Sequence, residues 1–290
     1  MPLIVIPDDE PAVVSVSAAF ARLNGMDVRT YASRPSNQAE LIDRIRDAKF
    51  VINVRARTRF SREVLQSCPQ LRLVSIWGTG TDNIDLPAAR ELGIRVTNTP
   101  GVSAIAVAEH ALTLMLAAAR QIVQVDQQVR AGQWPRAMVS QVAGKTVGLI
   151  GTGAIGKELA RLAKGIGCRV IGWTFHPRND VAEWVPFDDV FRQSHFVSVH
   201  VRQSPETMGM IRREHFKMMR PSAILINTAR GAIVNESDLV KALQTDQIAG
   251  AGLDVFEQEP LPSDSPFFPC PTLFSPHIRQ RRCPRRLRRE

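Results

Sequence analysis

The fold class follows from residues 146–178, which read TVGLIGTGAIGKELARLAKGIGCRVIGWTFHPR. Val147, Leu149 and Ile150 form an apolar run that is too short for a helix and predicts a buried strand. Apolar residues then recur at helical spacing as far as Gly167, where the helix is expected to end. A second apolar run, Arg169–Trp173, predicts another strand. Together these segments have the length of a right-handed β-α-β unit.

Three glycines, Gly151, Gly153 and Gly156, lie between the first strand and the helix in the pattern G-x-G-x-x-G. Gly151 permits a tight turn, Gly153 lets the backbone approach a pyrophosphate, and Gly156 lets the helix pack closely on the strand. The helix N-terminus offers unpaired N–H groups to the phosphates. In a chain with 18 glycines the spacing alone is weak evidence, and the flanking strand and helix strengthen it. We predict a dinucleotide site here.

The end of the second strand bears on the choice of dinucleotide. The acidic residue that usually holds the ribose 2′-hydroxyl would fall at Thr174. Its absence removes a negative charge that would repel a 2′-phosphate, and Arg178 just beyond could bind that phosphate. Arg178 fits a solvated loop charge equally well. We therefore expect NAD or NADP as the cofactor, with a preference for NADP.

Length and composition limit the class of protein. A chain of 290 residues suits two domains, and 44% hydrophobic with 22% charged residues is typical of a globular protein. No apolar run approaches the roughly 20 residues of a membrane span, and the first residues lack the basic start of a signal peptide. The four cysteines have no C-x-x-C spacing, which favours buried or free thiols over a disulfide or metal framework. We expect a cytoplasmic protein without a metal or membrane partner.

The net charge of +9 is concentrated at one end of the chain. Residues 279–290 contain seven arginines and one glutamate, and so carry +6 of that charge. The remaining charge is ordinary for an enzyme of this size. A nucleic-acid partner is therefore not expected, apart from nonspecific contacts of this tail with phosphate backbones.

Strand and helix patterns alternate along the whole chain, which predicts an α/β protein with two doubly wound parallel sheets. We place one domain at residues 1–98 and the dinucleotide-binding domain at residues 99–278. A long apolar segment, Ala104–Arg130, opens the second domain, and His110 within it fits a core or interface histidine better than a catalytic one. The predicted strands are Leu3–Ile6, Val28–Tyr31, Phe50–Val54, Leu71–Trp77, Ile94–Thr97, Phe196–Val201, Ala223–Asn227, Ile248–Val255 and Thr272–Ser275. The other predicted helices are Val13–Leu23, Ala39–Arg46, Arg62–Ser67, Leu86–Leu92, Phe187–Arg192, Arg213–Met218 and Ser237–Leu243, the last with a capping start at Asn235.

Polar residues follow three predicted strands of the second domain and could carry hydride-transfer chemistry. Arg230 could bind a substrate carboxylate through its planar fork. His277 could carry a proton near neutral pH, and Glu259 could fix the tautomer of that imidazole. In the first domain, Arg55 ends a strand and the turn at Gly78 could expose amides to an anion. A surface arginine and a plain glycine turn are the alternatives there.

Several motifs resemble the D-isomer-specific 2-hydroxyacid dehydrogenase family, of the phosphoglycerate dehydrogenase and glyoxylate/hydroxypyruvate reductase kind. The resemblance extends to about residue 278. It implies a Rossmann domain inserted in a flavodoxin-like substrate domain, and hydride transfer between NAD(P)(H) and C2 of a D-2-hydroxy acid or 2-keto acid. It also implies a homodimer built on the dinucleotide-binding domain. The motifs are VRART (Val54–Thr58), GTGTDNIDL (Gly78–Leu86), TNTPG (Thr97–Gly101), VAEHALTLML (Val107–Leu116), GLIGTGAIG (Gly148–Gly156), INTARGAIVNE (Ile226–Glu236), GAGLDVFEQEPLP (Gly250–Pro262) and SPHI (Ser275–Ile278).

The resemblance also implies roles for single residues. Arg230 would bind the substrate carboxylate and carbonyl, His277 would be the acid/base, and Glu259 rather than Glu257 would pair with it. Arg55 and Gly78 would help to hold the substrate. The cofactor site would include the three glycines, Thr174 and Arg178. It would also include Thr79, Ala154, Ile155, Val201, Thr228, Ala229 and Asp254.

The chain departs from the family pattern in two further places. Arg202 and the two residues after it replace a stretch where relatives commonly carry a proline. After Ile278 the arginine-rich residues 279–290 stand where the family has a turn and a helix returning to the first domain. We expect this to be a truncated or frameshifted return that lowers stability and impairs activity. A dinucleotide-sensing interaction protein, similar to the family's corepressor relatives, is the alternative function.

Overall fold

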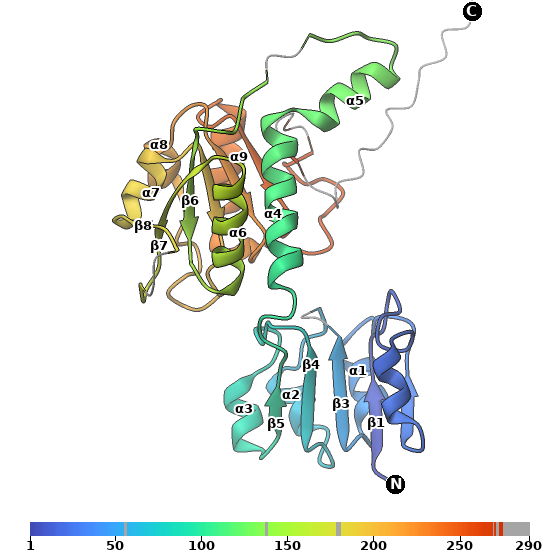
Figure 1. The fold of residues 1–290 in the computed structure, drawn as a ribbon. Helices are drawn as coiled ribbons and strands as arrows, with labels where there is room; N and C mark the ends of the chain where they lie inside the picture. Colours follow the sequence, from blue (N-terminus) through green and yellow to red (C-terminus); the bar gives the residue numbers. More distant parts are fainter. Residues whose placement is uncertain (55–56, 137–138, 178–180, 269, 271–272, 275–290) are drawn as a thin grey trace, which may run out of the picture. The chain divides into compact units, whose positions relative to one another are not determined.

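The chain folds into two compact units, Met1–Ser103 and a second that begins at Ala104 (Figure 1). The computed structural model describes residues 1–54, 57–136, 139–177, 181–268, 270 and 273–274. Each unit is a parallel β-sheet with helices against it, so the predicted α/β class with two parallel sheets is confirmed. The truncated or frameshifted return expected at residues 279–290 lies outside the described residues.

Among the described residues of the first unit, five parallel strands form a sheet in the order β2-β1-β3-β4-β5. This is the strand order of flavodoxin-like folds. The register places Val51 of β3 opposite Val74 of β4, which brings two buried side chains together. The strands are β1 (Leu3–Ile6), β2 (Asp27–Thr30), β3 (Phe50–Val54), β4 (Leu73–Trp77) and β5 (Arg95–Thr97).

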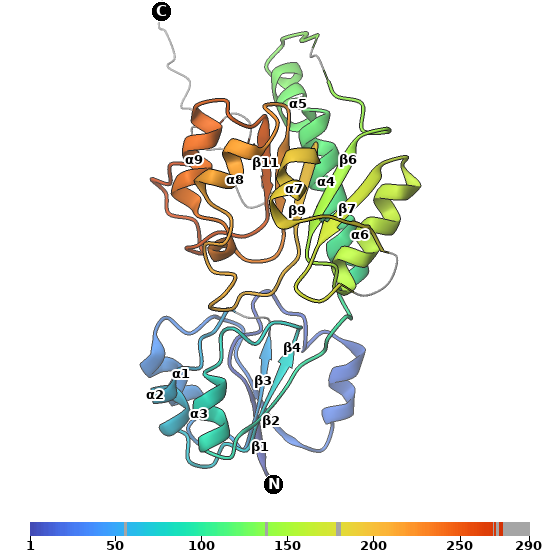
Figure 2. The same ribbon diagram turned by 90° about the vertical axis from the view of Figure 1, so that its left-hand side faces the viewer.

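Three helices, α1 (Gln38–Ile45), α2 (Arg62–Gln66) and α3 (Leu86–Glu91), cover one face of this sheet (Figure 2). Each begins at a side chain that accepts the backbone amide three residues later, an N-cap arrangement that satisfies a donor without an intrahelical partner. The caps are Asn37, Ser61 and Asp85. The main core of the unit lies between these helices and the strands and includes Leu41, Ile45, Val64, Leu65, Val51 and Val74.

The helix predicted at Val13–Leu23 was wrong in its first half. The chain forms only a 3-10 helix, η1 (Ala18–Leu23). The carboxylate of Asp9 accepts the amides of Val13, Val14 and Ser15 at 2.9–3.0 Å. Because a short polar side chain competes in this way for backbone donors, it holds the segment in a loop.

In the second unit, the described residues form a seven-stranded parallel sheet in the order β12-β11-β10-β9-β6-β7-β8. Read from β8 to β11, this is the order of the dinucleotide-binding fold, whose ligand crevice lies where the direction of the order reverses, between β6 and β9. The strands are β6 (Thr146–Ile150), β7 (Arg169–Trp173), β8 (Glu183–Trp184), β9 (Phe196–Val199), β10 (Ile224–Asn227), β11 (Gly250–Leu253) and β12 (Leu273–Phe274).

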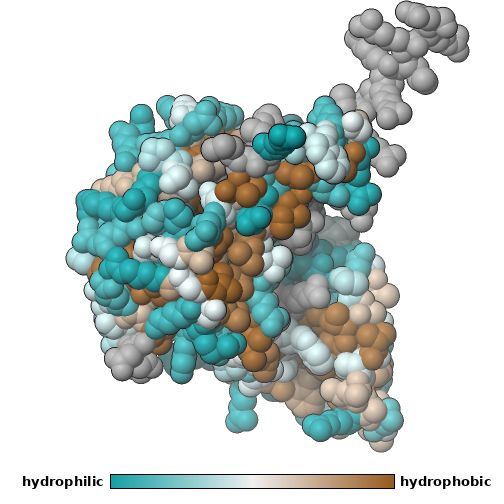
Figure 3. Space-filling model, turned by 45° about the horizontal axis from the view of Figure 1, so that its top comes forward, coloured by the Kyte–Doolittle hydropathy of each residue, from teal (hydrophilic) through white to brown (hydrophobic). Residues whose placement is uncertain are grey.

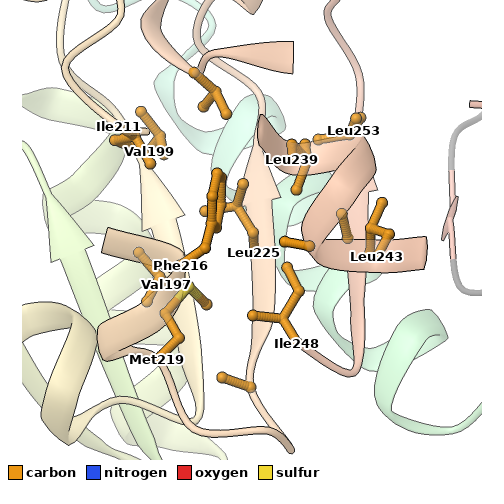
Figure 4. Close-up of a cluster of buried hydrophobic side chains, with 14 of the residues drawn as sticks. Val197, Val199, Ile211, Phe216, Met219, Leu225, Leu239, Leu243, Ile248 and Leu253 are labelled. Carbon is orange, nitrogen blue, oxygen red and sulfur yellow. The ribbon is translucent and has the colours of Figure 1, made fainter. Parts of the chain in front are cut away.

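Helices cover both faces of the second sheet. On one face lie α4 (Ala104–Ala119) and α6 (Ala154–Gly165), packed on each other over a buried cluster that includes Ala108, Met115 and Leu159. On the other face lie α7 (Phe187–Gln193), α8 (Arg213–Met218) and α9 (Glu236–Gln244). Their core includes Phe216 of α8, Leu239 and Leu243 of α9, and strand residues such as Val197 and Leu225 (Figure 4).

The apolar segment Ala104–Arg130 is not one helix. It divides into α4 and α5 (Ile122–Arg130), which meet at an angle of 57°. Gln121, between them, has a φ of 51°, in the left-handed region that ends a helix. Over the described ranges no single helix is long and apolar enough to cross a membrane, and only this bent pair meets the criterion of length and composition.

The cysteines agree with the expectation of buried or free thiols. Cys68, Cys168 and Cys270 are free and buried, and burial raises the pKa of each thiol, that of Cys68 to about 11. Cys283 lies outside the described residues. Within that described part of the chain, no group of three His, Cys, Asp or Glu side chains could hold a metal ion.

Candidate functional site

The glycine loop after β6 is shaped by two close backbone approaches. Gly151 has a φ of 94°, and a Cβ there would lie 2.8 Å from the carbonyl carbon of His200 and the amide nitrogen of Val201. A Cβ on Gly156 would lie 2.2 Å from the carbonyl oxygen of Gly151. Both positions therefore require glycine, the first for its turn and the second for the packing of α6 against the loop.

Gly153 is different, because a Cβ there would meet nothing within 4 Å. It is the N-cap of α6, with no side-chain capping bond. The amide of Lys157 donates to the Gly153 carbonyl at 2.9 Å, and the amides before it, including those of Ala154 and Ile155, precede the first intrahelical bond. Open space in front of a 12-residue helix, with its positive dipole end, fits a diphosphate.

Thr174 lies beside this loop at the end of the neighbouring strand. Ile150 of β6 is in register with Trp173 of β7, and the Gly151 amide donates to the Trp173 carbonyl at 2.8 Å. Thr174 follows directly and is partly exposed. Thr174, which replaces the usual ribose-binding acid, is thus adjacent to the glycine turn. Arg178 lies outside the described residues.

The backbone of His200 lies directly against the glycine loop. Its amide donates to the Ile150 carbonyl at 2.7 Å, and its ring Nε2 lies 2.9 Å from Ser198 Oγ. Its Nδ1 is buried without a hydrogen-bond partner in the described part of the chain. Burial lowers the pKa of His200 to about 4, so the ring is neutral near pH 7. The sequence motifs do not single out this histidine, because its contact with Gly151 arises from the pairing of β6 with β9.

The loop after β10, which carries Arg230, is organised by Asn227. The Asn227 side chain accepts the Ala229 amide at 3.0 Å and donates to the Arg230 carbonyl at 2.9 Å. Arg230 Nη1 donates to the Ala229 carbonyl at 2.7 Å. Thr228 is buried, and its Oγ1 has no hydrogen-bond partner among the residues described. The sequence places Asn227 at the end of a predicted strand, and an asparagine in that position was the available signal for its role in bracing this loop.

Asp254 follows β11 and adjoins the same loop, since its amide donates to the Asn227 carbonyl at 3.0 Å. His110 of α4 brings its Nε2 to 3.2 Å from Asp254 Oδ1, and the two side chains are 35% and 31% exposed. His110 was expected to be a core or interface histidine. It lies partly exposed beside a predicted cofactor residue, because α4 packs against β11, and its interface role stays a prediction.

The loop that carries Glu259 is interlocked with the loop that carries Arg230. A Cβ on Gly231 would lie 2.0 Å from the carbonyl carbon of Phe256 and 2.3 Å from the amide nitrogen of Glu257. Glu259 Oε1 accepts the Phe256 amide at 2.9 Å. Arg230 and Glu259 are therefore held in adjacent loops. The predicted partner of Glu259, His277, lies outside the described residues, so their pairing stays a prediction.

Two further glutamates tie these loops to α9. Glu236 Oε1 accepts the Glu257 amide at 2.6 Å, and Glu257 Oε1 accepts the Glu236 amide at 3.3 Å. Burial raises the pKa of Glu236, and the charges of Glu257 and Glu259 raise it further. These two reciprocal side chain–backbone hydrogen bonds hold the loop at Glu257 against the start of α9.

The predicted site residues of the first unit fall on the turn after β4 and on an undescribed segment. The Gly78 amide donates to Thr99 Oγ1 at 3.1 Å, and the Thr99 amide donates to the Gly78 carbonyl at 2.8 Å. Thr79 Oγ1 donates to the Thr99 carbonyl at 3.2 Å. The hydroxyl of Thr99 accepts the Gly78 amide in this structure, and the role of Gly78 in holding the substrate stays a prediction. Arg55 lies outside the described residues.

Comparison with known proteins agrees with this geometry. Residues 112–278 match the model of the D-isomer specific 2-hydroxyacid dehydrogenase NAD-binding domain. The chain is 41% identical over 243 residues to a glyoxylate reductase of Korarchaeum cryptofilum, covering 80% of this chain and 73% of the relative. The TT0316 protein of Thermus thermophilus superposes with a TM-score of 0.85 at 34% identity, covering 96% and 89% of the two chains. An acyclic imino acid reductase solved with NADPH and D-Arg gives 0.86 at 28% identity, covering 95% and 89%.

Proposed function

The chain belongs to the D-isomer specific 2-hydroxyacid dehydrogenase family, and from that premise we propose that it reduces a small 2-keto acid, glyoxylate in the first place. Its class of reaction is NAD(P)-linked hydride transfer on 2-hydroxy and 2-keto acids. The observation that supports the proposal most directly is the open approach to the N-terminus of α6 at Gly153, within a sheet of dinucleotide-binding order. Glyoxylate is named because the relative with 41% identity is a glyoxylate reductase.

The proposed division of labour follows from the chemistry of the side chains. A bound nicotinamide dinucleotide supplies the hydride. Arg230 binds the substrate carboxylate and polarises the carbonyl oxygen, since a guanidinium fork matches a carboxylate and remains charged. His277 gives a proton to the ketone oxygen during reduction and takes it back during oxidation. Glu259 holds the tautomer of that imidazole, and Asp254 contacts the cofactor.

The proposed activity is tested by following NADH and NADPH oxidation with glyoxylate, hydroxypyruvate and pyruvate. Arg230→Gln should lower kcat/KM by roughly 10²–10³-fold while coenzyme binding is retained, because one charged donor to the reacting group is lost. Arg192→Gln is the matched control, since Arg192 forms ion pairs on the exposed side of α7. Coenzyme binding without turnover of any of the three acids would overturn the proposal and favour a dinucleotide-sensing protein.

For the coenzyme, we propose a preference for NADPH. The support is the hydroxyl of Thr174 beside the glycine turn, where a carboxylate would repel a 2′-phosphate. Thr174→Asp should shift the ratio of kcat/KM for NADPH to that for NADH toward NADH by at least about tenfold, the equivalent of 1.4 kcal/mol. A wild-type protein that prefers NADH would contradict this part of the proposal.

We further propose a homodimer through the second unit. Hydrophobic surface gathers on the side of this unit that carries α4 and α5 (Figure 3), where Ile122, Val123, Val129 and Trp134 are exposed. An exposed apolar patch of this kind is typical of a protein interface. Light scattering should give twice the chain mass for the wild type and a smaller mass for Val123→Glu. A monomeric wild type would contradict the proposal.

A further inference from the structure

An open surface depression of about 380 Å³, called the cavity below, lies on the outer side of the second unit between α8 and α9, and the cationic side chains that line it are exposed. Arg213 and Lys217 are one turn apart on α8, and Asp238 and Lys241 are one turn apart on α9, so each helix presents a pair of side chains to the space between them. Beneath it the helices pack on the sheet through Phe216, Leu239 and Leu243 (Figure 4). The complete lining is Arg213, Lys217, Asp238, Lys241, Thr245 and Gln247.

The charges in this cavity are not balanced. It contains three cations and one carboxylate, and Asp238 Oδ2 already accepts the backbone amide of Arg213 at 3.0 Å. Arg213, Lys217 and Lys241 form no ion pair with any residue that the structure describes.

Other helix arginines behave differently. Arg130, Arg161 and Arg192 each pair with a carboxylate three or four residues away on their own helix. The arginines of α5, α6 and α7 are therefore paired with carboxylates, whereas Arg213, Lys217 and Lys241 lie together between α8 and α9 without such partners in the described part of the chain. A concave site lined by one sign of charge raises the local concentration of ions of the opposite sign.

We propose that this cavity binds a small anion with several negative charges, such as a diphosphate or a tricarboxylate. The two lysines and Arg213 give charge-assisted hydrogen bonds, and the Gln247 side-chain amide adds a neutral donor. Thr245 Oγ1 donates to the Lys241 carbonyl at 2.8 Å, which holds the end of α9 rather than the ligand. The carboxylate of Asp238 disfavours singly charged ligands that cannot offset its repulsion.

The proposed site is separate from the dinucleotide loop. Helices α8 and α9 lie on the face of the sheet opposite α6, whose N-terminus begins at Gly153. A diphosphate offered to the protein can bind at either place. The experiment must therefore report the position of binding as well as its strength.

The test is an NMR titration of the full-length, ¹⁵N-labelled protein with inorganic pyrophosphate and, separately, with citrate. Amide shifts in residues 213–217 and 238–247 that saturate at millimolar concentration support the site, and the tighter of the two ligands identifies its chemical class. Shifts at residues 151–156 report the dinucleotide loop independently. Shifts confined to that loop, or none in 213–247 with either ligand, overturn the proposal.

Single substitutions then distinguish binding by the lining residues from general attraction of anions to a positively charged surface. Lys217→Gln and Lys241→Gln should each weaken binding at residues 213–247 by about tenfold, since one charge-assisted hydrogen bond is lost. Lys217→Arg, which keeps the charge, should restore most of the affinity. Arg220→Gln removes the same charge from an exposed position outside the lining and should change the affinity less than about twofold. Equal losses in the lysine variants and in Arg220→Gln overturn the proposal.

Discussion

Each unit contains a glycine turn directly after a parallel strand. The amide of the first glycine is bonded in both turns, and the turns differ in how soon a helix begins after it. In the first unit, Gly78 follows β4, but α3 begins only at Leu86, and the Gly78 amide and carbonyl are both bonded by Thr99. In the second, Gly151 follows β6, and α6 begins at Ala154 behind an unobstructed Gly153. Glycine after a strand is thus insufficient for an anion cradle. The helix must start at once, and its first amides must remain unbonded.

The largest effect on the glycine turn of the second unit is expected from a side chain at Gly156. Gly156→Ala should destabilise the second unit by about 3 kcal/mol or more, because its Cβ meets backbone rather than a movable side chain. Thermal unfolding measures the loss. Gly165→Ala, in the same helix with nothing within 4 Å of its Cβ, is the control and should be neutral or stabilising by about 0.5–1 kcal/mol.

Gly153→Ala tests the proposed diphosphate site without disturbing the packing, since its Cβ would point into open space. Stability should be unchanged while coenzyme affinity falls. A Gly153→Ala protein that binds coenzyme as the wild type does would show that the backbone does not approach a diphosphate there.

Gly231→Ala should separate the Arg230 loop from the Glu259 loop. Its Cβ would overlap the backbone of Phe256, and relief requires a shift of the interlocked loops. We expect a loss of about 1–3 kcal/mol in unfolding free energy and a fall in kcat/KM larger than the fall in coenzyme affinity. Equal losses in both quantities would contradict the assignment of this region to substrate rather than coenzyme.

The pH dependence of the second unit should reflect His200. Burial lowers its pKa to about 4 from 6.5, so between these values the unfolded chain binds a proton that the folded chain does not. Stability therefore falls as the pH drops, by about 2 kcal/mol between pH 7 and pH 5 from this group alone. His200→Gln keeps a polar side chain near Ser198 but cannot titrate. It should remove this part of the pH dependence of the unfolding free energy measured in urea. An unchanged slope would show that His200 is not buried as neutral imidazole.

The smallest effect is expected in the first unit. Thr99→Val removes the hydroxyl that accepts the Gly78 amide and should cost about 1 kcal/mol, since the bond lies at an exposed site. Hydrogen exchange at Gly78 should become faster while exchange along β6 and α6 is unaffected. Faster exchange in both units would show that the two turns are coupled.

The sequence by itself determined the features that depend on neighbouring residues. The glycine spacing, the strand before it and the helix after it predicted the loop at Gly151, the close packing at Gly156 and the alternation of elements in both sheets. The capping start of α9 at Asn235 was also predicted and is confirmed, with its side chain accepting the Asp238 amide. Local patterns are sufficient here because turns, caps and periodic faces involve residues a few positions apart.

Only the tertiary structure decided which distant residues meet. His110 beside Asp254, Thr99 on Gly78, His200 beneath Gly151, and Gly231 against Phe256 each join different elements. No local pattern encodes such a contact, because it depends on strand order and on how closely two backbones approach. The wrong helix start at Val13 has a local cause instead, because the Asp9 side chain accepts amides that helical propensity alone would have assigned to a helix.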